Sequence, residues 1–192
     1  MPLNVLLLGP QGAGKGTQAA RISTEYSIPH VASGEILRSE MQAGTELGRR
    51  VKDVYDRGDL VSDDLMIELI RTRLGQGDTD GGFILDGFPR TTRQAEALDE
   101  MFGDIGRSFN VVFALQIPDE VAFERLRKRA EIEGRADDTD EAIRRRLENY
   151  HRETEPLIEY YRARGNLVPI HGERTENEVF AEVQSALEQV PA

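Results

Sequence analysis

Short apolar runs alternate with longer amphipathic stretches along this chain, which predicts a regular series of strands and helices. The apolar runs predict strands at residues 3–8, 28–32, 82–86, 110–117 and 166–170. Strands that are apolar on both sides are typical of parallel sheets covered by helices on both faces. The pattern therefore predicts an α/β fold with a five-stranded parallel sheet in a three-layer α/β/α arrangement.

The amphipathic stretches between these runs predict the helices. Ser33 is expected to cap one helix N-terminus, Gly58 to end another helix, and Thr175 to form a capping box with Glu178. Pro156 is expected to kink the last long helix. The helices are expected at residues 14–26, 33–42, 45–57, 62–74, 91–102, 119–129 and 139–164, and from residue 175.

A glycine-rich segment, GPQGAGKGT at residues 9–17, joins the first predicted strand to the first predicted helix. Glycines let backbone N–H groups close around anionic oxygens, and the helix N-terminus adds partial positive charge. Lys15 supplies a mobile charge, and Thr17 a hydroxyl within reach of a metal ion. Gly16 stands where the usual G-x-x-x-x-G-K-[ST] pattern has Ser or Thr. Lysine occurs only three times among 24 basic residues, and its compact ammonium suits a tight phosphate nest.

Further polar features follow the second and third predicted strands, at the same edge of a parallel sheet. Ser33 follows the second strand, and Asp86 ends the third. A carboxylate beside a phosphate loop is suited to organising magnesium, whereas a strand-end Asp on its own would be read as a cap. Gly87 and Pro89 shape a turn that directs Arg90. The residues predict a site for a phosphorylated ligand at this edge.

Arginines gather in the third quarter of the chain. Arg125 and Arg129 share one helix face, Arg135 lies in a short acidic gap, and Arg146 lies on a later helix. Some arginines of this region are expected on solvated faces. Guanidinium groups bind phosphate oxygens in bidentate fashion, so arginines from three elements predict a clamp around a polyphosphate.

The composition of the chain argues against several classes of partner and site. At 192 residues the chain is expected to form one domain, and its net charge of −11 argues against a nucleic-acid partner. It has no cysteine, which excludes disulfides and thiolate-bound zinc. No apolar run approaches the roughly 18 residues of a membrane span, and no signal-peptide pattern is seen, so no membrane partner and a cytoplasmic location are expected.

Five segments spread in order over nearly the whole chain resemble the adenylate kinase family. The phosphate loop ends in Gly-Lys-Gly-Thr, as that family's loop does. Five residues separate Arg129 from Arg135, which resembles the family's short-lid form, so no zinc is expected; Ala130 and Glu133 replace the Gly and Ser common there. The resembling segments are GPQGAGKGT (9–17), SGEILR (33–38), GDLV (58–61), DGFPRT (86–91) and GRADD (134–138).

The resemblance implies a P-loop NTPase-like fold and a reaction in which MgATP phosphorylates AMP to give two ADP, reversibly, for adenine nucleotide homeostasis. It implies one core domain over residues 1–192 with two mobile insertions, an AMP-binding segment at 32–61 and a short lid at 129–138. The implied partners are ATP, AMP and ADP. A monomer is expected, because one chain contains a complete site.

The resemblance also implies individual roles, with Asp86 near the magnesium ion, through water. Catalytic roles are implied for Lys15, Arg90, Arg129, Arg135 and Arg146. ATP binding is implied for Gly12, Ala13, Gly14, Lys15, Gly16, Thr17, Arg125, Arg129, Gly172 and Arg174. AMP binding is implied for Ser33, Gly34, Arg38, Asp59, Leu60, Val61, Gly87, Phe88, Pro89, Arg90, Gln94, Arg135 and Arg146.

Three other functions are weighed. A UMP/CMP kinase shares the scaffold, but Thr91 and Gln94 after Arg90 favour adenine, because an amide pairs with donor and acceptor edges. A GTP switch needs an Asn-Lys-x-Asp segment, which the sequence does not contain. A nucleotide sensor without turnover would not need Lys15, Asp86 and the arginines together.

Overall fold

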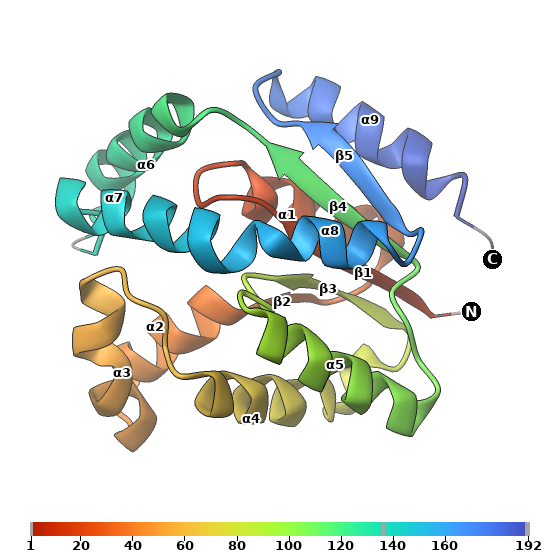
Figure 1. Ribbon diagram of the computed structural model, residues 1–192, viewed down its shortest axis with the longest axis horizontal. Coiled ribbons are helices and arrows are strands. Elements are labelled where there is room, and N and C mark those ends of the chain that lie inside the picture. The colour runs from red at the N-terminus through yellow and green to blue at the C-terminus, as the bar shows by residue number, and fades with distance from the viewer. Residues whose placement is uncertain (1, 136, 191–192) are drawn as a thin grey trace.

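A computed structural model describes residues 2–135 and 137–190. Its strands form one five-stranded sheet, in which every neighbouring pair is parallel and the order is β2-β3-β1-β4-β5 (Figure 1). The predicted α/β class with a five-stranded parallel sheet is confirmed. The strands are β1 (Leu3–Leu8), β2 (His30–Ala32), β3 (Gly82–Asp86), β4 (Val111–Gln116) and β5 (Leu167–His171).

Helices connect these strands and cover the sheet. Two short elements accompany the α-helices, a 3₁₀ turn η1 (Gly77–Thr79) and a π-helical segment η2 (Tyr150–Thr154). The helices are α1 (Lys15–Tyr26), α2 (Ser33–Ala43), α3 (Glu46–Asp56), α4 (Asp63–Leu74), α5 (Thr92–Ile105), α6 (Asp119–Glu133), α7 (Asp140–Asn149), α8 (Pro156–Arg162) and α9 (Glu176–Leu187).

Alternate residues of β1 belong to two different apolar clusters, one on each face of the sheet. Val5 and Leu7 pack with residues of α1 and α9, whereas Leu6 and Leu8 pack with residues of α4, α5 and α8. Figure 1 shows α9 alongside β5, with α2 and α3 on the opposite side of the molecule. Because both faces are buried, the strands read as continuous apolar runs.

The register of the sheet brings the strand ends together. Asp86 pairs with Leu7 of β1 and with Ala32 of β2. The phosphate loop, the start of α2 and the turn after β3 therefore lie side by side at the carboxyl edge, where open parallel sheets bind ligands.

Helices α5 and α6 both end later than the sequence predicts; α5 reaches Ile105 instead of residue 102. Helix α6 continues past Arg129 to Glu133, and Gly134 ends it in the left-handed conformation, with φ of 63°. Ala130 and Glu133 have high helix propensity, so they extend the helix into the segment expected to be a lid.

The single kinked helix predicted over residues 139–164 is wrong. The π-helical segment η2 separates α7 from α8, and Pro156 lies in the first turn of α8. A proline fits the first turn of a helix, where its missing N–H has no partner in any case. The departure from α-helical hydrogen bonding therefore lies at Tyr150–Thr154, before the proline.

One of the predicted helix caps is present in the structure, and another is not. Thr175 and Glu178 form the predicted capping box of α9. The N-cap of α2 is Ala32 rather than Ser33, whose hydroxyl has no hydrogen-bond partner among the described residues. The Ser33 hydroxyl lies beside Gly87, where an added Cβ would come within 2.6 Å of it, so it faces the strand edge instead of its own helix.

The two segments expected to move are differently built. Helices α2 and α3 pack closely at Gly48, where an added Cβ would lie 2.2 Å from the Glu40 carbonyl oxygen. The segment expected to be a short lid is mostly the last turn of α6 and the link to α7, and its residue 136 lies outside the described residues. Within residues 2–135 and 137–190, no helix combines the length and apolarity needed to span a bilayer.

Candidate active site

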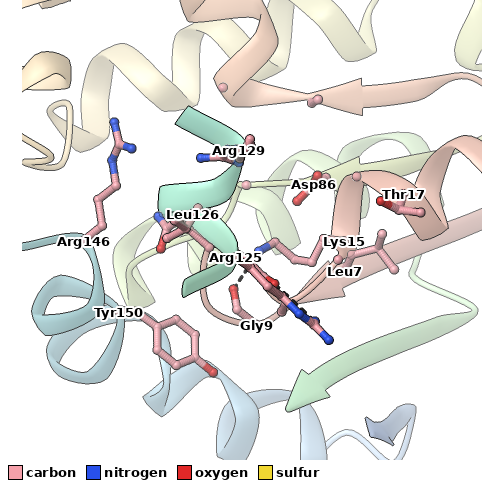
Figure 2. Close-up of a pocket in the computed structure, with 18 of the residues that line it drawn as sticks. Leu7, Gly9, Lys15, Thr17, Asp86, Arg125, Leu126, Arg129, Arg146 and Tyr150 are labelled. Atoms are coloured by element: carbon pink, nitrogen blue, oxygen red, sulfur yellow. Dashed lines mark hydrogen bonds between the residues drawn. The ribbon is translucent and has the colours of Figure 1, made fainter. Parts of the chain in front are cut away.

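A cavity of about 800 Å³ opens at the carboxyl edge of the sheet (Figure 2). The phosphate loop forms one wall, and α6, α7 and η2 form another. The start of α2, the end of α3 and the turn after β3 complete it. Elements far apart in the sequence therefore meet around a volume large enough for a sizeable ligand.

The phosphate loop needs its glycines for two separate reasons. Gly9, Gly12 and Gly14 all have positive φ, of 141°, 85° and 93°. A Cβ at Gly12 would lie 2.8 Å from the carbonyl oxygen of Ala122 on α6, so the loop also packs too closely for a larger residue. The loop is thereby held against α6 with its N–H groups available to an anion.

Lys15 lies folded over this loop. Its Nζ donates hydrogen bonds to the carbonyl oxygens of Gly9 at 2.8 Å and Pro10 at 2.9 Å (Figure 2). The pKa of Lys15 is lowered to about 8, mainly by burial; Asp86 opposes this shift, and the charges of Arg90 and Arg129 add to it. Burial disfavours the charged form of a lysine, and a nearby anion would favour it.

Asp86 lies near this lysine and beside His30. The His30 Nε2 is 3.5 Å from the carboxylate, and both side chains are largely buried. Burial alone would raise the pKa of Asp86, but contact with His30 and the charges of Lys15 and Arg90 outweigh it and hold the pKa below its usual range. Asp86 is thus a carboxylate held in its ionised form at the cavity wall.

The arginines of α6 and α7 share one buried acid. Asp138 is 5% exposed. It accepts a hydrogen bond from the Nε of Arg129 at 2.8 Å and another from Nη1 of Arg146. Asp137 binds the second terminal nitrogen of Arg146 at 2.9 Å. The pair of acids therefore fixes two guanidinium groups from different helices at the same wall.

Arg125 spans the donor side of the cavity. Its Nη1 donates to the carbonyl oxygen of Gly172 at 2.9 Å and, more weakly, to that of Gly12 at 3.4 Å. This side chain links α6 to the phosphate loop and to the segment after β5. In the view of Figure 2, Arg125 and Arg129 stand on one helix, between Lys15 and Arg146. Arg174, after β5, also lines the cavity and pairs with Glu182.

The opposite side carries Arg38 and Arg90. The Nη1 of Arg38 donates to the hydroxyl of Tyr55 at 2.8 Å. The Nε of Arg90 donates to the carbonyl oxygen of Gly87 at 2.7 Å, and burial lowers the pKa of Arg90. Both guanidinium groups line the cavity.

Most of the predicted site residues line this cavity, including Lys15, Asp86 and the six arginines discussed so far. The remainder of the lining set predicted from sequence is Gly12, Ala13, Gly14, Gly16, Thr17, Gly34, Asp59, Leu60, Gly87, Pro89, Arg135 and Gly172. Arg135 is paired with Glu133 at 2.5 Å. The structure therefore brings the predicted donor and acceptor residues to one place.

Four predicted acceptor residues lie outside the lining: Ser33, Val61, Phe88 and Gln94. Gln94 was expected to read the adenine base. It is 2% exposed, its oxygen accepts from the backbone N–H of Arg90 at 2.7 Å, and its nitrogen donates to Asp63 at 2.8 Å. In this structure Gln94 holds the Arg90 turn.

Several lining residues were not found from the sequence. Asn149 donates to the carbonyl oxygen of Gly58 at 3.0 Å, and Thr154 donates to that of Arg90 at 2.8 Å. Both flank or belong to η2, a type of segment that often marks functional sites. A polar residue in a long helical pattern gives no sign that its helix changes phase. The other lining residues that were missed include His30, Tyr55 and Tyr150.

Among the described residues, no group of three or more His, Cys, Asp or Glu side chains is placed to hold a metal ion. The cavity nevertheless contains the Asp86 carboxylate and the Thr17 hydroxyl. Such a set suits Mg²⁺, which keeps several waters and is usually bound through one or two carboxylates together with substrate phosphates.

Comparisons with known proteins agree with this geometry. Residues 7–166 match the family model described as "Adenylate kinase". A protein named "Adenylate kinase" from Thermus thermophilus is 48% identical over 95% of this chain and 96% of its own length. Proteins of the same name from Xanthomonas euvesicatoria and Stenotrophomonas maltophilia are 45% and 43% identical, each over 96% of this chain and 99% of their own.

The matched residues include the phosphate loop, the turn after β3 and both arginine-bearing helices. A family model covering this much of the chain, together with relatives that align from end to end, accounts for the fold and the cavity at once: the chain belongs to the adenylate kinase family.

Proposed function

We propose that this protein transfers the γ-phosphoryl group of MgATP to AMP, giving two ADP, in a reversible reaction. The observation that carries the proposal is the cavity itself, in which the Lys15 loop shares one lining with arginines from α2, the turn after β3, α6, α7 and the segment after β5. Phosphoryl transfer needs alignment of donor and acceptor and neutralisation of charge more than it needs covalent help from the protein. The family of the chain supports the same reaction.

ATP is proposed to bind on the phosphate-loop side. The N–H groups of residues 12–17 and the ammonium of Lys15 would hold its phosphates, since the positive φ glycines present the backbone to the cavity. Arg125 would lie against the adenine, as a guanidinium suits an aromatic face. Gly172 and Arg174 complete this side.

AMP is proposed to bind between α2, α3 and the turn after β3. Arg38 and Arg90 would hold its phosphate, and Gly34, Asp59, Leu60, Gly87 and Pro89 would form the walls. Ser33, Val61, Phe88 and Gln94 would act from behind this lining. Arg129, Arg135 and Arg146 line the same cavity and would meet the phosphoryl group in transfer.

Magnesium is proposed to arrive with ATP, with Asp86 holding its water ligands and Thr17 adjacent to it. When bound it would neutralise charge on the phosphates. No zinc site is proposed, since the sequence has no cysteine.

Closure is proposed to exclude water, which would otherwise accept the phosphoryl group in place of AMP. The moving parts would be residues 32–61 and 129–138. The Asp138 carboxylate already holds Arg129 and Arg146 in place, so closure would deliver oriented arginines.

The test compares AMP, CMP and UMP as acceptors in a coupled assay for ADP formation. We expect AMP to be preferred by at least about 100-fold in kcat/KM, consistent with discrimination by pairing to buried polar groups. Preference for CMP or UMP would favour the pyrimidine-kinase alternative, and ATP binding without turnover would indicate a sensor.

We also propose a monomer, because one chain supplies every residue of this cavity, and a cytoplasmic location, where such a reaction would serve nucleotide balance. Sedimentation at increasing concentration and cell fractionation test these two points.

A further inference from the structure

We infer that Tyr55 is a positioning residue of the acceptor side, which acts by holding Arg38. The inference rests on the proposed function and names a residue that the sequence analysis did not find. Tyr55 lies on α3, and its hydroxyl oxygen accepts a hydrogen bond from Nη1 of Arg38 at 2.8 Å.

The ring and backbone of Tyr55 also contact an arginine of the opposite wall. The guanidinium carbon of Arg146 is 5.5 Å from the centroid of the Tyr55 ring, and Nη2 of Arg146 is 3.5 Å from the Tyr55 carbonyl oxygen. Tyr55 therefore touches two of the arginines proposed to hold phosphate, one from α2 and one from α7. Figure 1 shows α3 beside α7, which makes this bridge possible.

The Arg38–Tyr55 pair is confined by the start of α2. A Cβ added at Gly34 would lie 3.4 Å from Nη1 of Arg38 and 3.8 Å from the Tyr55 hydroxyl. A second cavity of about 470 Å³ lies on the far side, and Arg38, Tyr55, Arg135 and Asp137 line both cavities. The pair thus belongs to the partition between the main cavity and its neighbour.

This position gives the hydroxyl a specific task. An arginine has five N–H donors, so one bond to Tyr55 leaves four for an anion. Long side chains lose conformational freedom on binding, and an arginine that is already held loses less. Loss of the hydroxyl should weaken AMP binding without altering the donor side or the transfer step.

The first experiment is Tyr55→Phe, which removes the hydroxyl and keeps the ring. We expect KM for AMP to rise about tenfold, a typical effect of one hydrogen bond to a charged group, while kcat and KM for ATP stay within about twofold. Tyr160→Phe is the matched control: its hydroxyl donates to Asp99 at 2.6 Å, and Tyr160 does not line the cavity. The control should leave all three constants unchanged.

A double-mutant cycle separates action through Arg38 from an independent effect. Arg38→Met alone should raise KM for AMP, and Tyr55→Phe added to it should change that KM by less than about twofold. Multiplicative effects, an unchanged KM in Tyr55→Phe, or an equal rise in KM for ATP would each overturn the inference. Failure of the wild-type protein to phosphorylate AMP would refute the proposed function instead.

Discussion

The two sides of the cavity are built on different principles. On the donor side, nine consecutive residues form the phosphate loop, and its lysine is held by the carbonyl oxygens of Gly9 and Pro10. On the other side, arginines from separate helices are held mainly by side chains, with Asp138 shared between Arg129 and Arg146. One side is made by local backbone geometry, the other by tertiary contacts.

The two sides also differ in how their positive charges are balanced before any ligand binds. Lys15 rests on carbonyl dipoles, and its pKa is lowered to about 8, mainly by burial. Arg129 and Arg146 are compensated by full carboxylates. We expect the donor side to gain the most when phosphate arrives, and the arginine side to depend most on its own acids.

The largest effect is expected at Lys15. Lys15→Met should lower kcat on the order of 1,000-fold, because it removes a preorganised charge aimed at the transferring group. The same change should leave the free energy of unfolding equal or higher, since it removes a buried charge. A coupled assay and urea unfolding measure the two quantities. Normal turnover would contradict the role given to the loop.

On the arginine side, removing a charge is expected to lower the stability of the fold. Asp138→Asn should lower the free energy of unfolding by about 2 kcal/mol, because it leaves two guanidinium groups without their shared acid. It should also lower kcat, since Arg129 and Arg146 lose their orientation. Asp140→Asn is the control, because Asp140 lies in the same stretch of chain but pairs with Arg127 at the exposed surface. Equal effects of the two variants would show that Asp138 has no special part.

A smaller effect is expected from a substitution at Gly58, which lies two residues after the end of α3. Its φ is 78°, and an added Cβ would lie 2.5 Å from the carbonyl oxygen of Ala142 on α7. Gly58→Ala should cost about 1–3 kcal/mol of unfolding free energy and raise KM for AMP. Gly106→Ala is matched for backbone conformation, with φ of 64° and open space around the new Cβ. If the two substitutions have the same cost, the contact with α7 is unimportant.

The smallest expected effect is a pH-dependent change in stability at His151. Contacts with Glu155 and Asp119 raise the pKa of His151, so the stability this residue contributes is present at low pH and lost as pH rises through the folded-state pKa. His151→Gln should therefore destabilise the protein at about pH 5.5 and have little effect at about pH 8.5, by urea unfolding.

Lys15 should show the reverse dependence. Its pKa is lower in the folded protein than the 10.5 of an unperturbed lysine, so stability gained from its deprotonation grows as pH rises above about 8. The difference between wild type and Lys15→Met should shrink over that range. A difference that is constant with pH would contradict the lowered pKa.

Local patterns in the sequence were enough to predict much of the molecule. Each strand was predicted within two residues at either end, because buried parallel strands are apolar throughout. The capping box at Thr175 and Glu178 was also predicted, since a cap involves residues only three apart. The loop at residues 9–17 was predicted because its ligand-facing groups belong to its own backbone.

Other features depend on how distant elements meet. The end of α6 at Glu133 and the π-helical segment at Tyr150–Thr154 both differed from the prediction. Neither the buried position of Gln94 behind Arg90 nor the contact between Tyr55 and Arg38 is visible in the order of residues. Those outcomes are set by helix placement and by competition between hydrogen-bond partners.

The fold class and the donor loop follow from the order of the residues, because hydrophobic periodicity and glycine freedom act over neighbouring residues. The tertiary structure alone decided the strand order and the pairing of each arginine with its acid, carbonyl or phenol. These pairings depend on contacts between distant elements. A guanidinium on a long side chain takes the partner that packing brings to it, and packing is a property of the whole chain.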